Sequence, residues 1–401
     1  MSASPDDLET IPFAHLAPSE QRDRLKDLAV VFSKLGAIAF GGPAAHIAMI
    51  DDEVVQKRRW MSHSRLMDLL GVTNLIPGPN STELAIHIGY EYGGWRGLLV
   101  AGTCFILPAM LIVWLLAFLY MRYQALPQVE WLLYGIKPVV IAIVVQALWK
   151  LGKKAIKDGP TTLAAIAVIV AFFMGVHELL LLLVAGLGVM VVKNLACGRS
   201  LSALLLPTSG ILAQASTATP MAATTPGVFN IFLFFLKIGA VLYGSGYVLL
   251  AFLQRDVVER SQWLTSQQLL DAVAIGQVTP GPVFTTATFV GYLLGGNLGA
   301  IAATVGIFLP AFVLIWVVNP WVSKLRSSVW ASGFLDGVNA ATLGLMVIVT
   351  YTLTKTALID PFTIVVALLS AIAVFRFKVN SAWLVIAGGL VGLGAKLLGW
   401  V

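Results

Sequence analysis

Residues 74–82 read Asn-Leu-Ile-Pro-Gly-Pro-Asn-Ser-Thr, and residues 277–285 read Gln-Val-Thr-Pro-Gly-Pro-Val-Phe-Thr. Each Pro-Gly-Pro tripeptide follows an apolar stretch that is otherwise typical of a helix. Proline removes a backbone donor and disfavours helix in the residue before it, and a glycine between two prolines allows the chain to reverse. The two stretches therefore predict two broken helices, which lie 203 residues apart.

The broken helices belong to a long internal repeat. At a constant offset of 203 residues, the sequence pairs Phe32 with Phe235, Gly36 with Gly239, Trp60 with Trp263, and Asp68 with Asp271. After the loss of one residue the offset becomes 202, and Leu107-Pro108-Ala109 pairs with Leu309-Pro310-Ala311. Chance does not hold one register over nearly 80 residues, so the repeat indicates an internal duplication.

Changes in composition predict the boundaries of the two repeats. Residues 1–27 form a polar N-terminal segment, and residues 200–226 form an uncharged linker rich in Ser, Thr, Ala and Pro. The first repeat then covers residues 28–199 and the second covers residues 227–401. In the later part of each repeat, identity to the other repeat fades while the hydrophobicity persists.

The composition excludes an ordinary soluble protein. Of the 401 residues, 58% are apolar and only 11% are charged, whereas a soluble domain carries roughly 25% charged residues. Long apolar runs such as 98–120, 231–253 and 299–318 are close to the roughly 20 helical residues that cross a bilayer. We therefore predict an all-α polytopic membrane protein, in which each half has about five crossings plus a broken, re-entrant helix pair at Pro-Gly-Pro.

Basic residues predict the orientation of the two halves. In the first half, Lys and Arg crowd the loops at 57–65, 150–157 and 193–199, and the corresponding loops of the second half are poorer in them. The loops at 121–130 and 177–178 show the opposite bias. Because basic residues favour the cytoplasmic side, this exchange predicts inverted repeats. The net charge of +6 then reflects cytoplasmic loops, and we expect the bilayer rather than nucleic acid as a partner.

The Pro-Gly-Pro breaks predict an anion site inside the membrane. Ser62 and Thr265 resemble helix N-caps, and a helix of about 14 residues from there spans only ~21 Å of a hydrocarbon core that is ~30 Å thick. Pro79 and Pro282 suit the first position of the next helix, whose free amides attract anions. On this reading the free amides are those of Asn80, Ser81, Thr82, Val283, Phe284 and Thr285. The alternative is that Pro-Gly-Pro only kinks a crossing helix.

Two matched lysines are candidates for neutralising a bound anion. Lys34 and Lys237 lie at equivalent positions in apolar stretches. A charge at the centre of a membrane helix costs ~2.5–3.5 kcal/mol, so such a residue is usually functional. The alternative is that Lys34 extends to the nearby interface. Together the two lysines would balance a dianion.

Further candidates fall into three groups, each with a structural alternative. Predicted hydrogen-bond donors to a substrate are Asn74, Gln277, Asn80, Ser81, Thr82, Thr285 and Thr286, although Ser and Thr also bond their own helix. Predicted break or gating residues are Gly41, Gly42, Pro43, Pro77, Gly78, Pro79, Gly244, Pro280, Gly281 and Pro282, where close helix packing is the alternative. Glu83, Asp68 and Asp271 are candidates for coupling or gating, with structural roles as the alternative.

The combined motifs resemble one transporter family. The tandem pattern F-x-K-x-G, F-G-G-P, a charged loop with Trp60, and P-G-P-N resembles the chromate ion transporters, specifically their long, two-domain members. The resemblance implies chromate efflux across a bacterial inner membrane, driven by the membrane potential or a proton gradient, with sulfate as a competing or exchanged anion. The second half departs from the pattern, because Gly244-Ser-Gly246 replaces Gly-Gly-Pro and Val283 replaces Asn80. We therefore expect two unequal sites.

Other functions stay open as alternatives. The same architecture would suit a transporter of sulfate or another oxyanion, a passive anion channel, or a membrane-embedded enzyme or scaffold. No nucleotide-binding loop, Walker motif, catalytic triad or metal-binding spacing is visible, so we expect neither a cofactor, nor a metal, nor enzyme activity. Ion-gradient coupling, with a proton as coupling ion, is then the predicted energy source, and a homodimer is compatible with the sequence.

Overall fold

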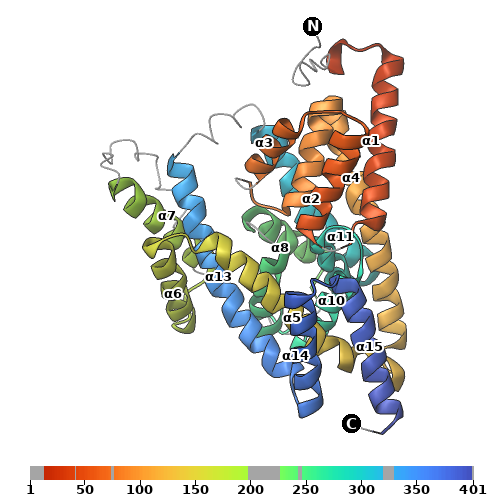
Figure 1. Cartoon of the computed structure of the whole chain (residues 1–401), viewed down its shortest axis with the longest axis vertical. Helices are drawn as coiled ribbons and strands as arrows, with labels where there is room; N and C mark the ends of the chain where they lie inside the picture. The colour runs from red at the N-terminus through yellow and green to blue at the C-terminus, as the bar shows by residue number, and fades with distance from the viewer. Residues whose placement is uncertain are drawn as a thin grey trace.

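The computed structural model describes residues 13–40, 42–73, 76–196, 226–242, 246–318 and 329–399, and over these ranges it contains helices and no strand (Figure 1). After the short turn η1 (Phe13–His15), the first half contains α1 (Pro18–Ile38), α2 (Pro43–Asp51), the π-helix η2 (Asp52–Lys57), α3 (His63–Thr73), α4 (Asn80–Tyr123), α5 (Pro127–Ala155), α6 (Gly159–Phe173) and α7 (Glu178–Ala196).

The second half repeats this order. It contains α8 (Val228–Val241), η5 (Gly246–Val248), α9 (Leu249–Phe252), the π-helix η6 (Leu253–Arg260), α10 (Ser266–Val278), η7 (Val283–Thr285), α11 (Thr286–Val318), α13 (Val329–Ala357), α14 (Pro361–Arg376) and α15 (Ser381–Leu397). Both halves therefore place a π-helix before the broken helix, a feature that the sequence comparison did not reveal.

The repeat continues to the C-terminus, although sequence identity fades. α5 begins at Pro127 and ends at Ala155, and α13 begins and ends 202 residues later, at Val329 and Ala357. The next helix of each half has the same aspartate cap: Asp158 accepts from the amide of Thr161 at 3.0 Å, and Asp360 accepts from that of Thr363 at 2.8 Å. Helix boundaries depend on caps and hydropathy, so they outlast the identities of lipid-facing residues.

The predicted breaks are present and buried in protein. α1 ends at Ile38 and α2 begins at Pro43, after Gly42 with a positive φ of 78°. Pro77–Pro79 and Pro280–Pro282 are buried. The helices before them have 11 and 13 residues, about 16 Å and 20 Å, so they are somewhat shorter than the 14 residues expected from sequence and cannot cross a ~30 Å core.

The helices after the breaks fold back on themselves. α4 loses helical geometry at Gly93 and Gly94, and α11 does so at Gly295 and Gly296; the second glycine of each pair has a φ of 59°. A Cβ at Gly89 would overlap the carbonyl of Gly97. Eight residues span ~12 Å along a straight helix, so this contact requires a hairpin. Each break therefore forms the predicted re-entrant pair, followed by a long crossing helix.

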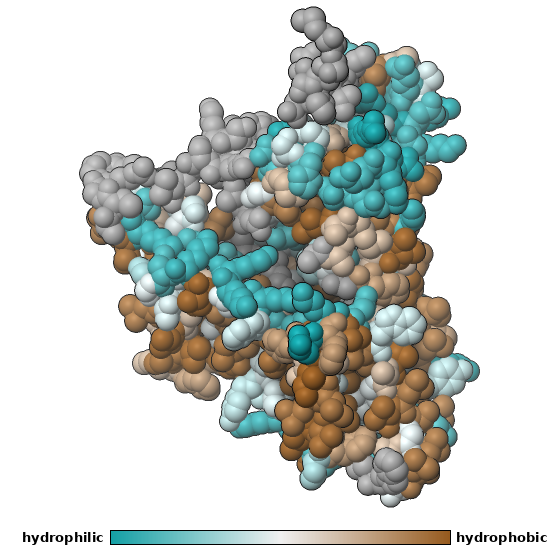
Figure 2. Space-filling view, in the orientation of Figure 1, coloured by the Kyte–Doolittle hydropathy of each residue, from teal (hydrophilic) through white to brown (hydrophobic). Residues whose placement is uncertain are grey.

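Several helices suit a bilayer. By length and composition, membrane-crossing candidates are 80–123, 127–155, 178–195, 283–317 and 330–357, and shorter apolar helices occupy 159–173, 228–241, 361–376 and 381–397. Large apolar side chains such as Trp383 and Leu390 are exposed on their outer faces, and brown hydrophobic residues dominate the lower part of the surface in Figure 2. The chain is therefore a multi-pass membrane protein.

The two halves pack through reciprocal contacts. α5 packs on α15 while α13 packs on α7, so each half offers the same surfaces to the other. Side-chain contacts between the halves are reciprocal as well. The Tyr134 hydroxyl donates to the carboxylate of Asp360 at 2.6 Å. The ammonium group of Lys193 lies 2.7 Å from the carboxylate of Asp336 and 2.7 Å from that of Asp158. Positions 336 and 360 lie 202 residues after 134 and 158. Such contacts define a pseudo-two-fold axis, and Figure 1 shows α5 and α13 running in roughly opposite directions, as inverted repeats require.

Candidate functional site

The start of the helix that follows the first-half break is held in place by hydrogen bonds. Asn80 begins α4, and the amides of Thr82 and Glu83 donate to the carbonyl of Pro79 at 2.8 and 3.0 Å. Thr82 therefore does not offer the free amide that was expected from sequence, because its N–H closes the first turn. The Ser81 hydroxyl is hydrogen-bonded to His46 Nδ1 at 3.2 Å, which fixes this start against α2.

The second-half break is packed rather than open. The amide of Gly281 donates to the carbonyl of Ala39 at 2.8 Å, and a Cβ at Gly281 would overlap the side chain of Ala109. The Thr285 hydroxyl donates to Pro282 at 2.7 Å and the Thr286 hydroxyl donates to Val283 at 2.8 Å. Both threonines thus bond their own helix start, which was the structural alternative, and the Thr285 amide is likewise used by Pro282.

Lys34 and Lys237 each form an ion pair within their own half. Lys34 Nζ lies 2.7 Å from Glu53, and Lys237 Nζ lies 3.2 Å from Asp256. Glu53 and Asp256 are equivalent positions in the two π-helices, so the duplication preserved the pair as a unit. Neither lysine lines the cavity described next, and their part in substrate binding stays a prediction.

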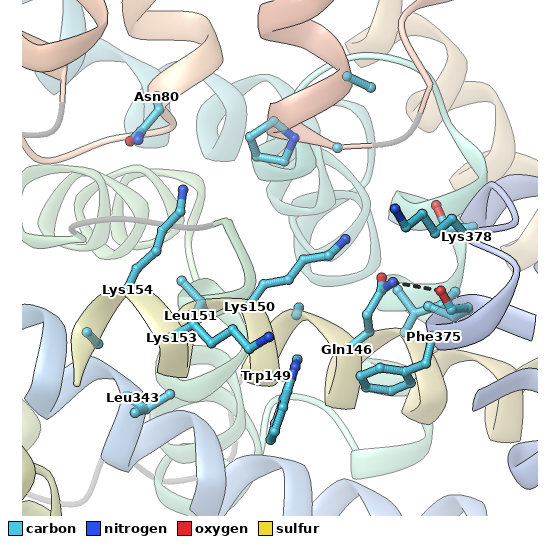
Figure 3. A pocket seen from close by; sticks show the side chains of 18 of the residues that line it. Asn80, Gln146, Trp149, Lys150, Leu151, Lys153, Lys154, Leu343, Phe375 and Lys378 are labelled. Carbon is cyan, nitrogen blue, oxygen red and sulfur yellow. Dashed lines mark hydrogen bonds between the residues drawn. The ribbon is translucent and has the colours of Figure 1, made fainter. Parts of the chain in front are cut away.

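A polar cavity of about 1090 Å³ lies between the first-half break and the end of α5. Gly42, Pro43 and Asn80 line it from the break. Opposite them are five lysines, which we call the lysine cluster: Lys150, Lys153, Lys154, Lys157 and Lys378. Figure 3 shows Lys154 pointing toward Asn80, with Lys150 and Lys378 entering the same space from α5 and from the α14–α15 loop. The cavity therefore combines a helix start with concentrated positive charge.

The lysine cluster follows from local sequence and from the inverted packing. Lys150, Lys153, Lys154 and Lys157 have the spacing that places residues on one face of a helix. Lys378 arrives from the loop between α14 and α15. With parallel repeats this loop and the end of α5 would lie on opposite sides of the membrane, so their shared cavity supports inversion.

Part of the lysine charge is not neutralised by protein. Lys157 pairs with Asp336 at 2.6 Å, and Lys153 lies 5.1 Å from the ring of Trp149. Among the described residues, Lys150, Lys153, Lys154 and Lys378 form no ion pair. These four ammonium groups give the cavity a net positive potential, which suits an anionic ligand.

Neutral polar groups and the neighbouring ion pairs hold the walls in place. Gln146 donates to the carbonyl of Val374 at 3.0 Å, and the Asn380 side chain caps α15 by accepting from Ala382 at 2.9 Å. Just outside the cavity, the hydrogen bond from the Lys193 ammonium holds the pKa of Asp158 below its usual range. The lysine cluster is thus carried by capped helix ends from both halves, which position its charges.

The candidate coupling residues differ in environment. Glu83 is fully buried, and neither of its carboxyl oxygens has a hydrogen-bond partner among the described residues. Asp271 is buried between Lys137, at 3.4 Å, and the Tyr120 hydroxyl, which donates to it at 2.9 Å. Asp68 is half-buried on α3.

The remaining sequence candidates can also be placed. Gln277 is buried near the end of α10. A Cβ at Gly78 would overlap the Glu83 carboxyl group, so Gly78 leaves room for that acid. Asn74, Gly41 and Gly244 lie outside the described residues.

Sequence reasoning missed two groups. The lysines of 150–157 were interpreted only as a cytoplasmic loop, although their one-face helical spacing was a signal for a lined site. Lys137 was not among the candidates, although a lysine inside an otherwise apolar membrane helix signals function. The structure adds that Gly36 and Gly239 allow close helix packing, because a Cβ there would overlap the carbonyls of Phe105 and Ile307.

A multi-pass helical protein with inverted repeats, re-entrant helix pairs and a charged cavity at a helix start has the architecture of a membrane transporter. Comparison of sequences identifies the family. The chain belongs to the chromate transporter family, whose model matches residues 26–191 and 229–393.

Curated relatives that match nearly the whole chain include two chromate transport proteins. That of Cupriavidus metallidurans is 31% identical over 98% of both chains, and that of Pseudomonas aeruginosa is 32% identical over 90% of both. An uncharacterised transporter of Bacillus subtilis is 28% identical over 32% of this chain and 73% of its own length. No solved structure matches the chain.

Proposed function

We propose that the chain exports chromate across a bacterial inner membrane by alternating access, and that the lysine cluster holds the dianion on its way through. The observation that carries the proposal is the set of four lysines that have no acidic partner among the described residues, Lys150, Lys153, Lys154 and Lys378, opposite the helix start at Asn80. Family membership and the names of the full-length relatives support chromate as the cargo.

The chemistry of the cavity predicts selection by charge more than by size. Lysine offers a flexible point charge rather than the rigid fork of arginine. A volume of about 1090 Å³ leaves room for a tetrahedral anion together with water. Sulfate has the same charge and shape as chromate, so we expect sulfate to compete for the cavity and to exchange with chromate.

The energetics favour export without nucleotide hydrolysis. Moving one charge through a membrane potential of 100 mV is worth ~2.3 kcal/mol, so an outward-moving dianion gains ~4.6 kcal/mol when the cytoplasm is negative. The lysine-rich ends of α5 and of the α14–α15 loop belong to the side that basic-residue bias assigns to the cytoplasm. The cavity would thus receive its anion from the cytoplasm. Glu83, which is buried and has no hydrogen-bond partner within the described part of the chain, stays our candidate for a coupling proton.

A counterflow experiment tests the proposal. Purified protein is reconstituted in proteoliposomes loaded with excess sulfate, and external chromate is followed by its absorbance at neutral pH without an imposed potential. We expect transient accumulation of chromate inside the vesicles above its external concentration. The reason is that a transporter which carries sulfate outward and releases it there presents its binding site to the external chromate. Equilibration without overshoot would indicate a passive channel, and the absence of flux for both anions would contradict oxyanion transport.

A further inference from the structure

A buried polar cluster joins the two halves away from the lysine cluster. Lys137 lies within α5, its side chain is only 8% exposed, and its Nζ is 3.4 Å from Asp271 Oδ1 on α10. Tyr120 on α4 donates to the other oxygen of Asp271 at 2.9 Å. A good charged hydrogen bond measures about 2.7–2.9 Å, so Lys137 is paired with Asp271 through a long contact. An ionised lysine in a membrane helix is costly and is a functional candidate by default.

The pseudo-two-fold axis relates Lys137 to a residue that lines the lysine-cluster cavity. The offset of 202 residues that aligns α5 with α13 makes Asn339 the equivalent of Lys137, since 137 + 202 = 339. Asn339 lines the lysine-cluster cavity. α5 and α13 make reciprocal contacts, so the Lys137 position faces the counterpart of that cavity in the other half. Lys137 therefore occupies the position at which a residue would face an anion in the counterpart cavity.

At that counterpart, contacts of one arginine join the two halves. Arg255 of η6 lies 2.7 Å from Glu178 at the start of α7, donates to the carbonyl of Gly175 at 3.4 Å, and covers the ring of Phe172 at 4.4 Å. We call these contacts the clasp. They hold the α6–α7 loop against the second half, whereas the equivalent α14–α15 loop, with Lys378, lines an open cavity. The clasp thus occupies the place of a cavity mouth.

We propose that Lys137 is a second anion-binding residue, which takes the tetrahedral oxyanion in the state that is open at the clasp, and that Asp271 neutralises the lysine while this site is empty. The inference rests on the proposed function. Inverted-repeat transporters exchange the conformations of their two halves, so opening the clasp would give Lys137 the exposure that Asn339 has here. An arriving dianion then replaces Asp271 at the ammonium group, and Tyr120 keeps the released carboxylate hydrogen-bonded.

A purely structural ion pair makes a different prediction. Replacing a buried pair by apolar residues of similar volume is often neutral or stabilising, whereas removing one partner leaves an uncompensated charge. The double variant Lys137→Met/Asp271→Leu keeps the fold and removes both charges. Lys137→Gln removes the ammonium group alone and keeps a polar side chain beside Asp271.

The test measures binding and flux separately. Chromate binding by purified protein is measured by isothermal titration calorimetry, and sulfate–chromate counterflow is measured in proteoliposomes. We expect both variants to bind chromate within about twofold of wild type, because the lysine cluster is intact, and to lose at least tenfold in counterflow. Lys26→Gln is the matched control, since Lys26 is exposed on α1 and lies outside the sites described.

Each outcome has a separate meaning. Wild-type counterflow in Lys137→Met/Asp271→Leu would overturn the inference and leave the proposed function standing. Loss of chromate binding in both variants, with an unchanged melting temperature, would also overturn it, because Lys137 would then act on the first cavity. If the wild-type protein itself neither bound nor moved chromate or sulfate, the proposed function would fail first.

Discussion

The cavity at the first-half break and its counterpart in the second half have the same backbone plan and opposite chemistry. At the positions equivalent to Lys150, Lys154 and Lys378, the counterpart has Thr352, Thr356 and Val176. At the helix start, Asn80 is replaced by Val283. The first region is open and positive, while the second lacks the matching lysines and is spanned by the clasp.

Some side-chain contacts are the same in the two regions, and they separate the shared architecture from the differences between the regions. Lys153 over Trp149 at 5.1 Å is matched by Lys355 over Tyr351 at 4.4 Å. Because this pair occurs in both regions, it belongs to the shared architecture rather than to the difference between them. Duplication thus supplied one geometry twice, and substitution of a few charges made the two regions unequal.

The largest expected effect comes from making the open cavity resemble its counterpart. Lys150→Thr/Lys154→Thr copies the two threonines of the second half and removes two lysines that lack acidic partners. Each ammonium near a dianion contributes several kcal/mol at short range, so we expect chromate counterflow to fall by about 100-fold. The measurement is the initial counterflow rate, with Lys26→Thr, at an exposed position on α1, as the control; comparable rates in both variants would remove the lysine cluster from the mechanism.

Opening the clasp should produce the next largest effect. Glu178→Gln weakens the contact with Arg255 that holds the α6–α7 loop. We expect about a tenfold change in counterflow, together with faster labelling of a cysteine introduced at half-buried Val176, because the closed state loses stability relative to the open one. The control is Arg65→Gln, which breaks the surface pair with Glu91 within one half. Unchanged labelling would show that the clasp does not hold this face closed.

A smaller effect is expected at the helix start itself. Asn80→Val gives the first break the residue of the second. The variant removes a polar side chain from the cavity but leaves the backbone and the lysines, so we expect chromate binding to weaken by about three- to tenfold. Calorimetric titration measures this change, and Val283→Asn serves as the reciprocal variant. Equal effects of the two substitutions would contradict the difference between the breaks.

The smallest effect should be equal in the two halves. Asp158→Ala and Asp360→Ala each remove the side-chain cap of equivalent helices. An N-cap aspartate contributes about 1 kcal/mol, so we expect each variant to lower the free energy of unfolding by that amount. Thermal unfolding in detergent measures the change. A much larger loss at Asp158 would indicate that its ion pair with Lys193 matters more than the cap.

Local sequence was sufficient for much of this fold. The N-caps at Ser62 and Thr265 are confirmed, because their hydroxyls accept from the amides of Arg65 and Gln268 at 3.2 and 3.1 Å. The breaks at Pro-Gly-Pro and after Ile38 are confirmed as well. These features depend on residues within a few positions of each other, so a linear sequence displays them directly.

The candidate site was harder to predict because its parts are distant along the chain. Asn80 was expected to bind substrate and does line the cavity, but Lys154 and Lys378 meet it only through packing of the two halves. Lys137 and Asp271 lie 134 residues apart along the chain, since 271 − 137 = 134, and no sequence motif indicates that they are in contact. Conversely, Thr285 and Thr286 looked available, yet the first turn of their own helix uses their hydroxyls.

Composition, periodicity and the repeated motifs were enough to predict a helical membrane protein that is duplicated and broken at two Pro-Gly-Pro tripeptides, because backbone hydrogen bonding in lipid leaves few other solutions. The sequence also predicted that the two copies would be unequal, but packing decided how they differ: it gathers lysines from both halves around one cavity and pairs Arg255 with Glu178 at its counterpart. The physical reason is that charge neutralisation depends on distances between side chains, and folding sets those distances for residues that the chain separates.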